Sequence, residues 1–465
     1  MPYIDFYYPG KSEVRDTLLF ENRIGTILHG ESDFYSDKGL QEIIQNVRDE
    51  YFILFMKCEL PNIGQYAFER MWQVAKDSGA GIIYADYYEM EKGKKIAHPL
   101  NDYQIGSLRD DFDFGPLLMI RTDIAKEILK SKKIKFQYAA LYDLRLKLSE
   151  KYPLIHLNEF LYTIKETDTQ DSEEKMFAYV DPKNRAVQIE MEQACTEHLK
   201  SIHAWLPPVF EEIDLQNETF PVEVSVIIPV RNRVRTINDA IDSVLSQKTA
   251  FPYNLIIIDN YSTDGTSEAI AKRAVTDQHI IHIIPKRNDL GIGGCWNEGV
   301  QHPECGRFSV QLDSDDVYSD TDTLSKIVQT FYAQNCAMLV GSYRMCNFDL
   351  QTIPPGIIDH KEWTPENGRN NALRINGLGA PRAFYTPALR EIKVPNTSYG
   401  EDYALGLQFS RHWKIGRIFD VLYLCRRWED NSDSSLDITK LNNYNAYKDK
   451  LRSIELKARQ KINNK

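Results

Sequence analysis

Patterns typical of buried strands and of amphipathic helices alternate along the second half of the chain. Residues 222–229 form a nearly continuous apolar run, as expected of a strand covered on both faces. Residues 235–247 then carry apolar side chains at helical spacing. Later strands are predicted at 255–259, 280–284 and 307–312, and later helices at 267–275 and 294–300. This alternation predicts βαβ units and a sheet with helices on both faces.

The first half of the chain resembles the second half in three places. Residues 81–87, 113–122 and 142–149 align with residues 337–343, 377–386 and 403–410, at offsets of 256, 264 and 261. Each match alone could be two unrelated amphipathic segments, but three in order predict an old duplication with small insertions. The first half is therefore expected to be a degenerate α/β domain of the same type.

The chain is expected to have four parts. Around residues 206–221 the periodicity fades, prolines stand at both ends and acidic residues collect, which is typical of a linker. The tail is basic, with apolar residues at nearly helical spacing, so it could dock on the chain's own domains or lie on an anionic membrane. The predicted parts are a degenerate α/β domain at 1–205, a linker at 206–221, a second α/β domain at 222–436 and a basic amphipathic helix at 437–465.

Three aspartates follow directly on an apolar run that ends at Leu312. Asp313, Asp315 and Asp316 would repel one another and lose hydration there, so such acids persist mainly beside a divalent cation or another cationic partner. They could instead cap the next helix. Asp259 also ends a predicted strand, and we expect it to face the same crevice as Asp313, at the carboxyl edge of the sheet.

Five motifs occur in order in the second domain. They are Val226–Asn232, Ile257–Asp264, Arg287–Gly291 with Asn297 and Gly299, Asp313–Asp315, and Gly400–Asp402. As a set they resemble the inverting glycosyltransferases of family 2 over roughly residues 222–436. The resemblance implies the GT-A fold, which is a Rossmann-like mixed α/β sheet with helices on both faces.

The resemblance also implies roles for the matching positions. The positions implied to bind the nucleotide are Pro229, Arg231, Asp259, Arg287 and Asp313. Asp259 would meet the base and Asp313 the ribose, while Asp315, with Asp313, would hold a Mn²⁺ or Mg²⁺ ion bound to both phosphates. Asp402 would be the general base that takes the proton of the acceptor hydroxyl, and Glu401 would orient the acceptor.

Four further residues are expected to contact the acceptor or the phosphates: Arg382, Arg427, Trp363 and His360. Trp296 stands where many relatives have a basic residue, so either Arg287 or the pair Arg426 and Arg427 could neutralise phosphate. The segment 353–363 looks like a mobile loop that brings His360 or Trp363 over the site.

Ordinary structural roles stay open for several of these residues. Glu401 and Asp402 could be first-turn acids of a helix after Gly400. Asp259 could belong to a turn-and-cap cluster, and His360 could be an ordinary surface histidine. The two arginines at 426 and 427 could be solvated or paired structurally.

Three sequence features depart from the family's pattern or need explanation. Asn260 stands where relatives often have a second aspartate, and residues 423–432 contain no histidine that could be a third metal ligand. The run Gly291-Ile-Gly-Gly294 lacks the lysine of a phosphate-binding loop, so we interpret it as a close approach of backbone at a helix start.

Composition restricts the partners. A formal net charge of −11 argues against a broad nucleic-acid-binding face, which needs a surplus of basic residues. The seven cysteines show no zinc-type or disulfide pattern. Because no apolar stretch reaches about 18 residues and the first residues do not resemble a secretory signal, a cytoplasmic location is expected. Peripheral membrane contact and homo-oligomer formation stay open.

These features favour a metal-dependent inverting transferase that moves a sugar from a UDP or GDP donor to a hydroxyl of a glycan or lipid-linked acceptor. The first domain has Lys57-Cys-Glu59 and Ala140-Leu141 at the positions of the two acidic motifs, so we expect it to be non-catalytic. One alternative is a sugar-phosphate nucleotidyltransferase, although residues 229–233 lack the glycine-rich loop that it needs. The other is a non-catalytic glycan-binding scaffold.

Overall fold

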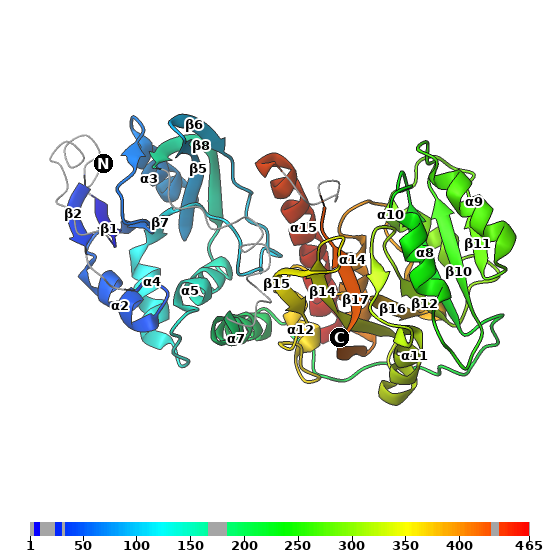
Figure 1. The fold of residues 1–465 in the computed structure, drawn as a ribbon. Helices are drawn as coiled ribbons and strands as arrows, with labels where there is room; N and C mark the ends of the chain where they lie inside the picture. The colour runs from blue at the N-terminus through cyan, green and yellow to red at the C-terminus, as the bar shows by residue number, and fades with distance from the viewer. Residues whose placement is uncertain (1–3, 10–23, 30–32, 166–183, 429–436, 465) are drawn as a thin grey trace. The chain divides into compact units, whose positions relative to one another are not determined.

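The computed structural model describes residues 4–9, 24–29, 33–165, 184–428 and 437–464, which fold as two compact units (Figure 1). The first unit contains the described residues up to Trp205 together with the C-terminal helix, and the second contains residues from Leu206 onwards up to the segment before that helix. The second unit is therefore inserted, in sequence, between two parts of the first.

The second unit is built on a nine-stranded mixed sheet. Its strands are β9 (Val224–Val230), β10 (Tyr253–Asp259), β11 (Ile280–Ile283), β12 (Phe308–Gln311), β13 (Val317–Tyr318), β14 (Met338–Cys346), β15 (Thr352–Ile358), β16 (Arg382–Tyr385) and β17 (Ile415–Arg426). The order is β11-β10-β9-β12-β16-β14-β17-β13, and β15 pairs with β14. The first four strands are parallel and β16 is antiparallel to its neighbours, so the expected α/β class with a mixed sheet is confirmed.

Helices connect these strands. They are α8 (Ile237–Leu245), α9 (Thr266–Thr276), α10 (Ile292–Val300), α11 (Thr323–Gln334), α12 (Gly368–Asn371), α13 (Thr386–Ile392) and α14 (Glu401–His412). The apolar residues of α8 that the helical spacing singled out, including Ile237, Ile241 and Val244, are fully buried. Burial of this stripe against the sheet stabilises the layer by the hydrophobic effect.

The segment 206–221 has no helix or strand, but it is bonded to the second unit. The backbone N–H of Leu206 donates to Asn370 Oδ1 at 3.0 Å, and Asn370 Nδ2 donates back to the Leu206 carbonyl at 2.9 Å. Further along, Arg307 Nη1 donates to the carbonyl of Leu215 at 2.5 Å. These bonds give the segment the role of an outer layer of the second unit.

The first unit is built on an eight-stranded mixed sheet. Its strands are β1 (Ile4–Tyr8), β2 (Ile24–His29), β3 (Tyr51–Phe55), β4 (Asn62–Ile63), β5 (Ile82–Glu91), β6 (Lys94–His98), β7 (Leu117–Arg121) and β8 (Leu154–Ile164). Its helices are α2 (Asp37–Asn46), α3 (Ala67–Ser78), α4 (Thr122–Ser131), α5 (Ala140–Ser149), α7 (Arg185–Ser201) and the C-terminal α15 (Ile438–Asn463).

The two sheets have the same strand order once β11 is set aside. The order β2-β1-β3-β7-β5-β8-β4 in the first unit corresponds strand for strand to β10-β9-β12-β16-β14-β17-β13, and β6 pairs with β5 as β15 pairs with β14. The registers also correspond, because Ile82 pairs with Ile120 and Leu154, whereas Met338 pairs with Phe384 and Ile415. These positions differ by the offsets of 256, 264 and 261 seen in the sequence. The predicted repeat is therefore confirmed.

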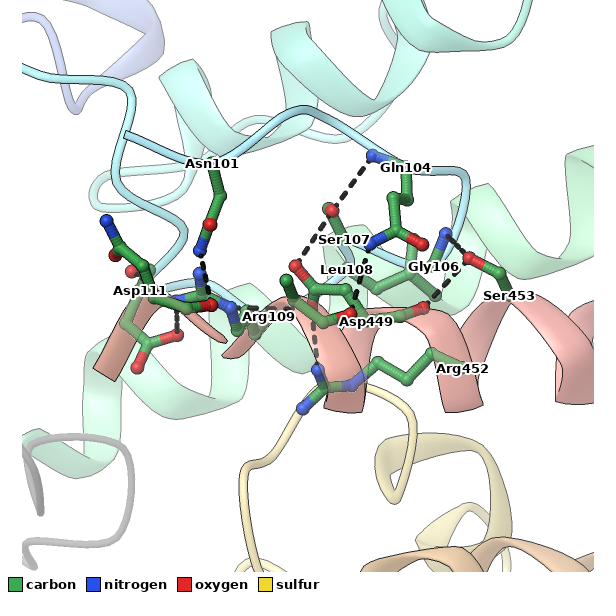
Figure 2. A network of polar contacts seen from close by, with 12 residues as sticks. Asn101, Gln104, Gly106, Ser107, Leu108, Arg109, Asp111, Asp449, Arg452 and Ser453 are labelled. Carbon is green, nitrogen blue, oxygen red and sulfur yellow. Dashed lines mark hydrogen bonds and ion pairs between the residues drawn. The ribbon is translucent and has the colours of Figure 1, made fainter. Parts of the chain in front are cut away.

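The C-terminal helix packs on the loop that follows β6 in the first unit (Figure 2). Asp449 accepts from Ser107 Oγ at 2.9 Å and from Arg452 Nη1 at 2.8 Å, and the N–H of Gly106 donates to Ser453 Oγ at 3.0 Å. A Cβ at Gly106 would lie 2.2 Å from the carbonyl oxygen of Asp449, so only glycine permits this approach.

Docking of the tail on the chain itself, one of the two expected outcomes, is what the structure shows. The chemistry of the contact differs from the apolar stripe in the sequence. Asp449, Arg452 and Arg459 are fully buried, whereas Ile454 is 56% exposed. Buried charges are tolerated when they are paired and hydrogen-bonded, and Arg459 Nε donates to Glu455 Oε1 at 2.7 Å.

Candidate nucleotide and transfer site

The candidate site lies at the carboxyl edge of the parallel strands of the second unit. β10, β9 and β12 are parallel neighbours, so Asp259 at the end of β10 and Asp313 just beyond β12 stand at the same edge, as predicted. Irregular backbone at strand ends lets polar side chains project without breaking the sheet's hydrogen bonds, which is why ligands gather at such edges.

Asp313 is held by its neighbours on the sheet. Gln311 Nε2 donates to both carboxylate oxygens, at 3.0 and 3.1 Å, and the backbone N–H of Asp313 donates to the hydroxyl of Tyr423 at 3.1 Å. Burial raises the pKa of Asp313, and the positive charge of Arg382 opposes this shift. A carboxylate with a raised pKa gains most from a second cation, because a cation restores the charged form.

Asp315 contacts the end of the last strand. Trp428 Nε1 donates to Asp315 Oδ2 at 3.2 Å, and Arg233 Nε lies 3.7 Å from the same oxygen. The guanidinium groups of Arg233 and Arg235 lie 5.7 and 5.1 Å from the centre of the Trp428 ring. Arg233 and the indole N–H of Trp428 therefore lie against this carboxylate, and Arg235 lies over the same indole ring.

Asp316 is buried and bonded to the protein backbone. Its Oδ1 accepts from the backbone N–H of Arg426 at 2.7 Å, and only 5% of the residue is exposed. Burial, together with the charges of Asp315 and Asp313, raises the pKa of Asp316 well above its usual value. Arg426 pairs with Asp239 at 2.6 Å and donates from Nε to the Asp315 carbonyl at 2.5 Å. Arg426 thus fastens β17 to the acidic turn.

These acids do not cap the next helix. α11 begins at Thr323, and its N-cap residue is Asp322. The backbone N–H of Asp316 donates instead to the Asp313 carbonyl at 3.2 Å, which closes a turn. The helix-cap interpretation of Asp313, Asp315 and Asp316 is therefore excluded.

Glu401 and Asp402 open α14, directly after Gly400. Gly400 has φ of +76°, a conformation in which glycine is not strained. Asp402 Oδ2 pairs with Arg382 Nη1 at 2.8 Å, and Asp402 Oδ1 accepts from the N–H of Tyr403 at 2.7 Å. Both residues are acids in the first turn of α14, which is a sufficient structural role for them. This role does not conflict with a second role in the reaction.

Arg382 is the cation that links the two acidic motifs. Burial alone would lower its pKa, but the carboxylates of Asp402, Asp313 and Glu401 together raise it. The side chain is 18% exposed and also donates from Nη1 to the carbonyl of Gly379 at 3.1 Å. Asp313, Glu401 and Asp402 therefore share one electrostatic environment around this guanidinium.

Glu401 has a carboxyl group whose pKa is strongly raised. Burial, and next the charge of Asp402, raise the pKa of Glu401 to about 8. Among the residues that the structure describes, its buried Oε2 atom has no hydrogen-bond partner. At neutral pH Glu401 is therefore mainly protonated, and a protonated carboxyl can donate a hydrogen bond.

Asp259 is fully buried and already holds the turn after β10. It accepts from the N–H of Ser262 at 3.0 Å and from the hydroxyl of Ser267, and His282 Nε2 lies 3.4 Å away. Burial would raise its pKa, but the hydrogen bonds from Ser267 and Ser262 outweigh this and lower it. The turn-and-cap interpretation describes these contacts, and base recognition by Asp259 stays a prediction.

The other residues expected at the nucleotide lie near this edge with varied exposure. Pro229 is half-buried in β9 opposite Ile258, and Arg231 is exposed. Arg287 is exposed and pairs with Asp289 through Nε at 2.8 Å and Nη2 at 2.6 Å. Their roles at the nucleotide stay predictions.

Residues 225–390 match the family model described as glycosyl transferase family 2. The second unit contains a family 2 glycosyltransferase domain. This match includes the acidic motif Asp313–Asp315 and Arg382, and it ends before Glu401 and Asp402.

Two curated relatives of the glycosyltransferase domain are named as a glycosyltransferase and a glucosyltransferase. The chain is 31% identical over 122 residues to the putative teichuronic acid biosynthesis glycosyltransferase TuaG of Bacillus subtilis, which covers 26% of this chain and 47% of that protein. It is 29% identical over 124 residues to the UDP-Glc:alpha-D-GlcNAc-diphosphoundecaprenol beta-1,3-glucosyltransferase WfgD of Escherichia coli. That match covers 27% of this chain and 47% of WfgD. The chain thus spans less than half the length of these relatives.

Among solved structures, the chain is similar to residues 1–349 of S. aureus TarS in complex with UDP-GlcNAc. The identity is 21%, the TM-score is 0.39, and the match covers 50% of this chain and 70% of that one. Among the helices of the described residues, none combines the length and the apolar character of a membrane-spanning segment.

The expectation of a mobile loop over the site is wrong. Residues 352–358 form β15, and His360 and Trp363 are buried, with 1% and 7% of each exposed. His360 Nδ1 lies 2.7 Å from Glu362 Oε1, and a Cβ at Gly368 would lie 2.3 Å from the Trp363 ring. Pairing and packing hold both side chains inside the domain, so His360 is not a surface histidine either. Their contact with an acceptor stays a prediction.

Arg427 lies just after β17, and Trp296 lies inside the domain. The N–H of Arg427 donates to the Cys346 carbonyl at 2.8 Å, at the end of β17. Trp296 is buried, with its ring centre 6.1 Å from that of Phe384. Trp296 therefore belongs to the core of the domain. Phosphate contact by Arg427 stays a prediction.

Sequence reasoning missed three residues that contact the acidic motif: Gln311, Arg233 and Trp428. A signal existed for Gln311, because a polar residue inside a buried apolar strand usually has a specific partner. Trp428 follows the two arginines at the end of β17, and nothing in its spacing pointed to Asp315. The pairing of β13 with β17 and the bonds of Arg426 to Asp315 and Asp316 bring these segments together.

The donor set of the acidic motif fits a hard divalent cation. Asp313 and Asp315 supply carboxylate oxygens, and over the described part of the chain no group of three or more His, Cys, Asp or Glu side chains forms a complete metal site. Mg²⁺ in particular is commonly bound by one or two carboxylates, with water and substrate phosphates as the other ligands. Asp313 and Asp315 offer two carboxylates of this kind, and a metal ion held by them stays a prediction.

Proposed function

We propose that the second unit is a metal-dependent inverting glycosyltransferase that moves a sugar from a UDP or GDP donor to a hydroxyl of a glycan. The observation that carries this proposal is the acidic environment of Asp313, Glu401 and Asp402 around Arg382, at the carboxyl edge of parallel strands. The family 2 match over residues 225–390 supports it. The name of WfgD favours a lipid-linked glycan as the class of acceptor.

In this mechanism Asp402 is the general base. It takes the proton of the acceptor hydroxyl while that oxygen attacks the anomeric carbon, and the bond from this carbon to the diphosphate oxygen breaks on the opposite face. Asp402 is paired with Arg382, and Glu401, whose pKa is raised to about 8, donates a hydrogen bond to an acceptor oxygen when it is protonated. One displacement inverts the anomeric configuration.

Asp313 and Asp315 would hold Mn²⁺ or Mg²⁺, which supplies positive charge to the leaving diphosphate. Arg382, beside Asp313, and Arg233, beside Asp315, would add fixed positive charge at the same edge of the sheet. Charges that are already oriented towards a developing negative charge lower the barrier without reorganisation during the reaction. Donor recognition by Pro229, Arg231, Asp259 and Arg287 belongs to the same proposal.

We propose that the first unit has no catalytic role. Lys57, Cys58 and Glu59 stand at the place of the acidic motif, and Glu59 pairs with Lys165 at 3.1 Å. Beside it, the Tyr87 ring stacks on His98 at 4.4 Å and on Tyr162 at 5.4 Å. Tyr162 corresponds to Tyr423 of the second unit: its ring is stacked on Tyr87, whereas the hydroxyl of Tyr423 accepts from the N–H of Asp313.

The test is an incubation of the full chain with a panel of UDP- and GDP-sugars, with Mn²⁺ or with EDTA. We expect slow donor hydrolysis, seen as Mn²⁺-dependent release of UDP or GDP. A parallel incubation with UTP or GTP and sugar 1-phosphates detects pyrophosphate. Pyrophosphate without nucleoside diphosphate release would overturn the proposal in favour of a nucleotidyltransferase, and no reaction with either set would favour the scaffold alternative.

A further inference from the structure

The segment that leads into Glu401 and Asp402 is fastened to the start of α10 by two asparagine side chains. Asn396 Oδ1 accepts from the N–H of Gly291 at 2.8 Å, and Asn396 Nδ2 donates to the Asp289 carbonyl at 3.1 Å. Asn297 does the same from the helix side: its Nδ2 donates to the Val394 carbonyl at 2.7 Å, and its Oδ1 accepts from the Val394 N–H at 2.9 Å.

A fifth hydrogen bond joins backbone to backbone between these segments. The N–H of Gly293 donates to the Thr397 carbonyl at 2.9 Å. The N–H groups of Gly291 and Gly293 lie at the N-terminus of α10, where such groups have no partner within the helix. The connection between α13 and α14 therefore satisfies the start of α10.

The glycines of this helix start make the contact possible. A Cβ at Gly293 would lie 1.8 Å from the Pro395 carbonyl oxygen, and a Cβ at Gly294 would lie 2.3 Å from Asn396 Oδ1. The predicted close approach of backbone at residues 291–294 is thus explained by the segment 394–397. The glycines admit a protein segment, and an anion is not needed to account for them.

The same helix start is also joined to the strand that carries Asp259. Asn260 Nδ2 donates to the Leu290 carbonyl at 2.9 Å. An aspartate, which relatives often have at this position, has no N–H to donate when ionised, so this bond explains why asparagine suits the site. Residues 289–293 therefore connect the end of β10 to the segment before α14.

We propose that Asn297 and Asn396 are positioning residues that fix Asp402 relative to the carboxyl edge of the sheet, where the donor is proposed to bind. This asparagine clamp, defined as Asn297, Asn396 and the five hydrogen bonds above, sets where residues 394–397 lie. Gly400 then turns the chain into α14, whose first residues are Glu401 and Asp402. The inference rests on the proposed function, because it gives the acids of α14 a reaction to serve.

The geometry predicts a specific kinetic effect. Loss of the two Asn396 bonds should leave the metal and nucleotide contacts intact and let the start of α14 move. A general base must lie within about 3 Å of its proton, so small displacements reduce turnover strongly. Two lost hydrogen bonds correspond to roughly a tenfold to hundredfold shift towards the released segment.

The experiment compares Asn396→Ala, Asn396→Asp and Asn254→Ala with the full-length parent chain. Asn254 is the matched control, because it also bridges two segments, through Ser225 and through the Glu304 carbonyl at 2.7 Å, but at the amino edge of the sheet. Amide hydrogen exchange is followed in peptides from residues 393–402 and 338–346. Turnover is measured with the nucleotide sugar that the screen identifies, and UDP and GDP binding by calorimetry with Mn²⁺.

For Asn396→Ala we expect roughly tenfold or faster exchange in residues 393–402, unchanged exchange in 338–346, and a kcat lowered roughly tenfold to hundredfold with the donor KM within about twofold. The exchange rate and kcat of Asn396→Asp should lie between those of the parent chain and those of Asn396→Ala. Its side chain still accepts from the N–H of Gly291 but no longer donates to the carbonyl of Asp289. Asn254→Ala should lower thermal stability without this split between kcat and KM.

Unchanged exchange in residues 393–402 of Asn396→Ala would overturn the clamp. Faster exchange with unchanged kcat, or with kcat and nucleotide affinity falling together, would overturn the positioning role. If the parent chain binds neither UDP nor GDP, the proposed function fails. The exchange comparison then still decides whether Asn396 holds the segment.

Discussion

Replacement of Asp402 by asparagine should lower sugar transfer by about 10² to 10⁴-fold, the range expected for loss of a positioned general base. Asparagine has nearly the same shape and can still accept from the Tyr403 N–H, but it cannot take a proton. Because Asp402 does not belong to the acidic motif that would hold the metal, UDP or GDP affinity should stay within about twofold. Initial rates and calorimetry on the same preparation check both statements.

Asp420→Asn is the matched control for this variant. Asp420 is exposed on β17, so the same change of charge should leave the rate unchanged. Full turnover by Asp402→Asn would contradict the assignment of the base. A loss of nucleotide affinity equal to the loss of rate would instead give Asp402 a role in donor binding.

Replacement of Asp315 by alanine should abolish the metal dependence of nucleotide binding and weaken binding by about 100-fold or more. The expected cause is loss of one of the two carboxylates that the site offers to a hard cation. Nearby Arg233 and Trp428 would remain, so some metal-independent affinity for the diphosphate is expected. Titrations of UDP and GDP with and without Mn²⁺ measure both parts.

Asp322→Ala is the control for the Asp315 variant, because it removes an aspartate at the start of α11 that pairs with Lys326 at 3.0 Å. It should change stability slightly and leave metal-dependent binding as in the parent chain. Metal-dependent binding that persists in Asp315→Ala would remove Asp315 from the metal site.

The architecture could be predicted from the sequence because it depends on patterns that repeat over many residues. Apolar runs at 222–229 and 255–259 became neighbouring strands, and the offsets between the halves reproduced the registers of Ile82 and Met338. Strand pairing follows from which faces are buried, and a slip by one residue would expose the core face. Small insertions therefore fall in loops and leave the register unchanged.

The site could be predicted only where a motif is local. Asp313–Asp315 and Glu401–Asp402 each stand out in a few residues, whereas the contact of Asp315 with Trp428 joins positions far apart in sequence. Arg382 was expected at the acceptor, and its pairing with Asp402 became visible only in the fold. Such contacts depend on how β16, β17 and α14 converge, and no short segment encodes this.

Burial was the property that sequence predicted least well. The proline-containing segment before Trp363 suggested a loop, but its residues pair with β14 as β15. The tail suggested an apolar docking face, yet Asp449 and Arg452 are buried through mutual pairing. In both cases specific partners offset the cost of burying polar groups, and the partners are remote in the sequence.

Calorimetric titration of the unaltered chain with UDP and with GDP, in Mn²⁺ and in EDTA, decides whether the second unit binds a nucleotide through a metal ion. At least one of the two nucleotides should bind in Mn²⁺, and its affinity should fall sharply in EDTA. Equal affinity in both buffers would contradict a metal held by Asp313 and Asp315. Absence of binding for both nucleotides would contradict the donor site itself.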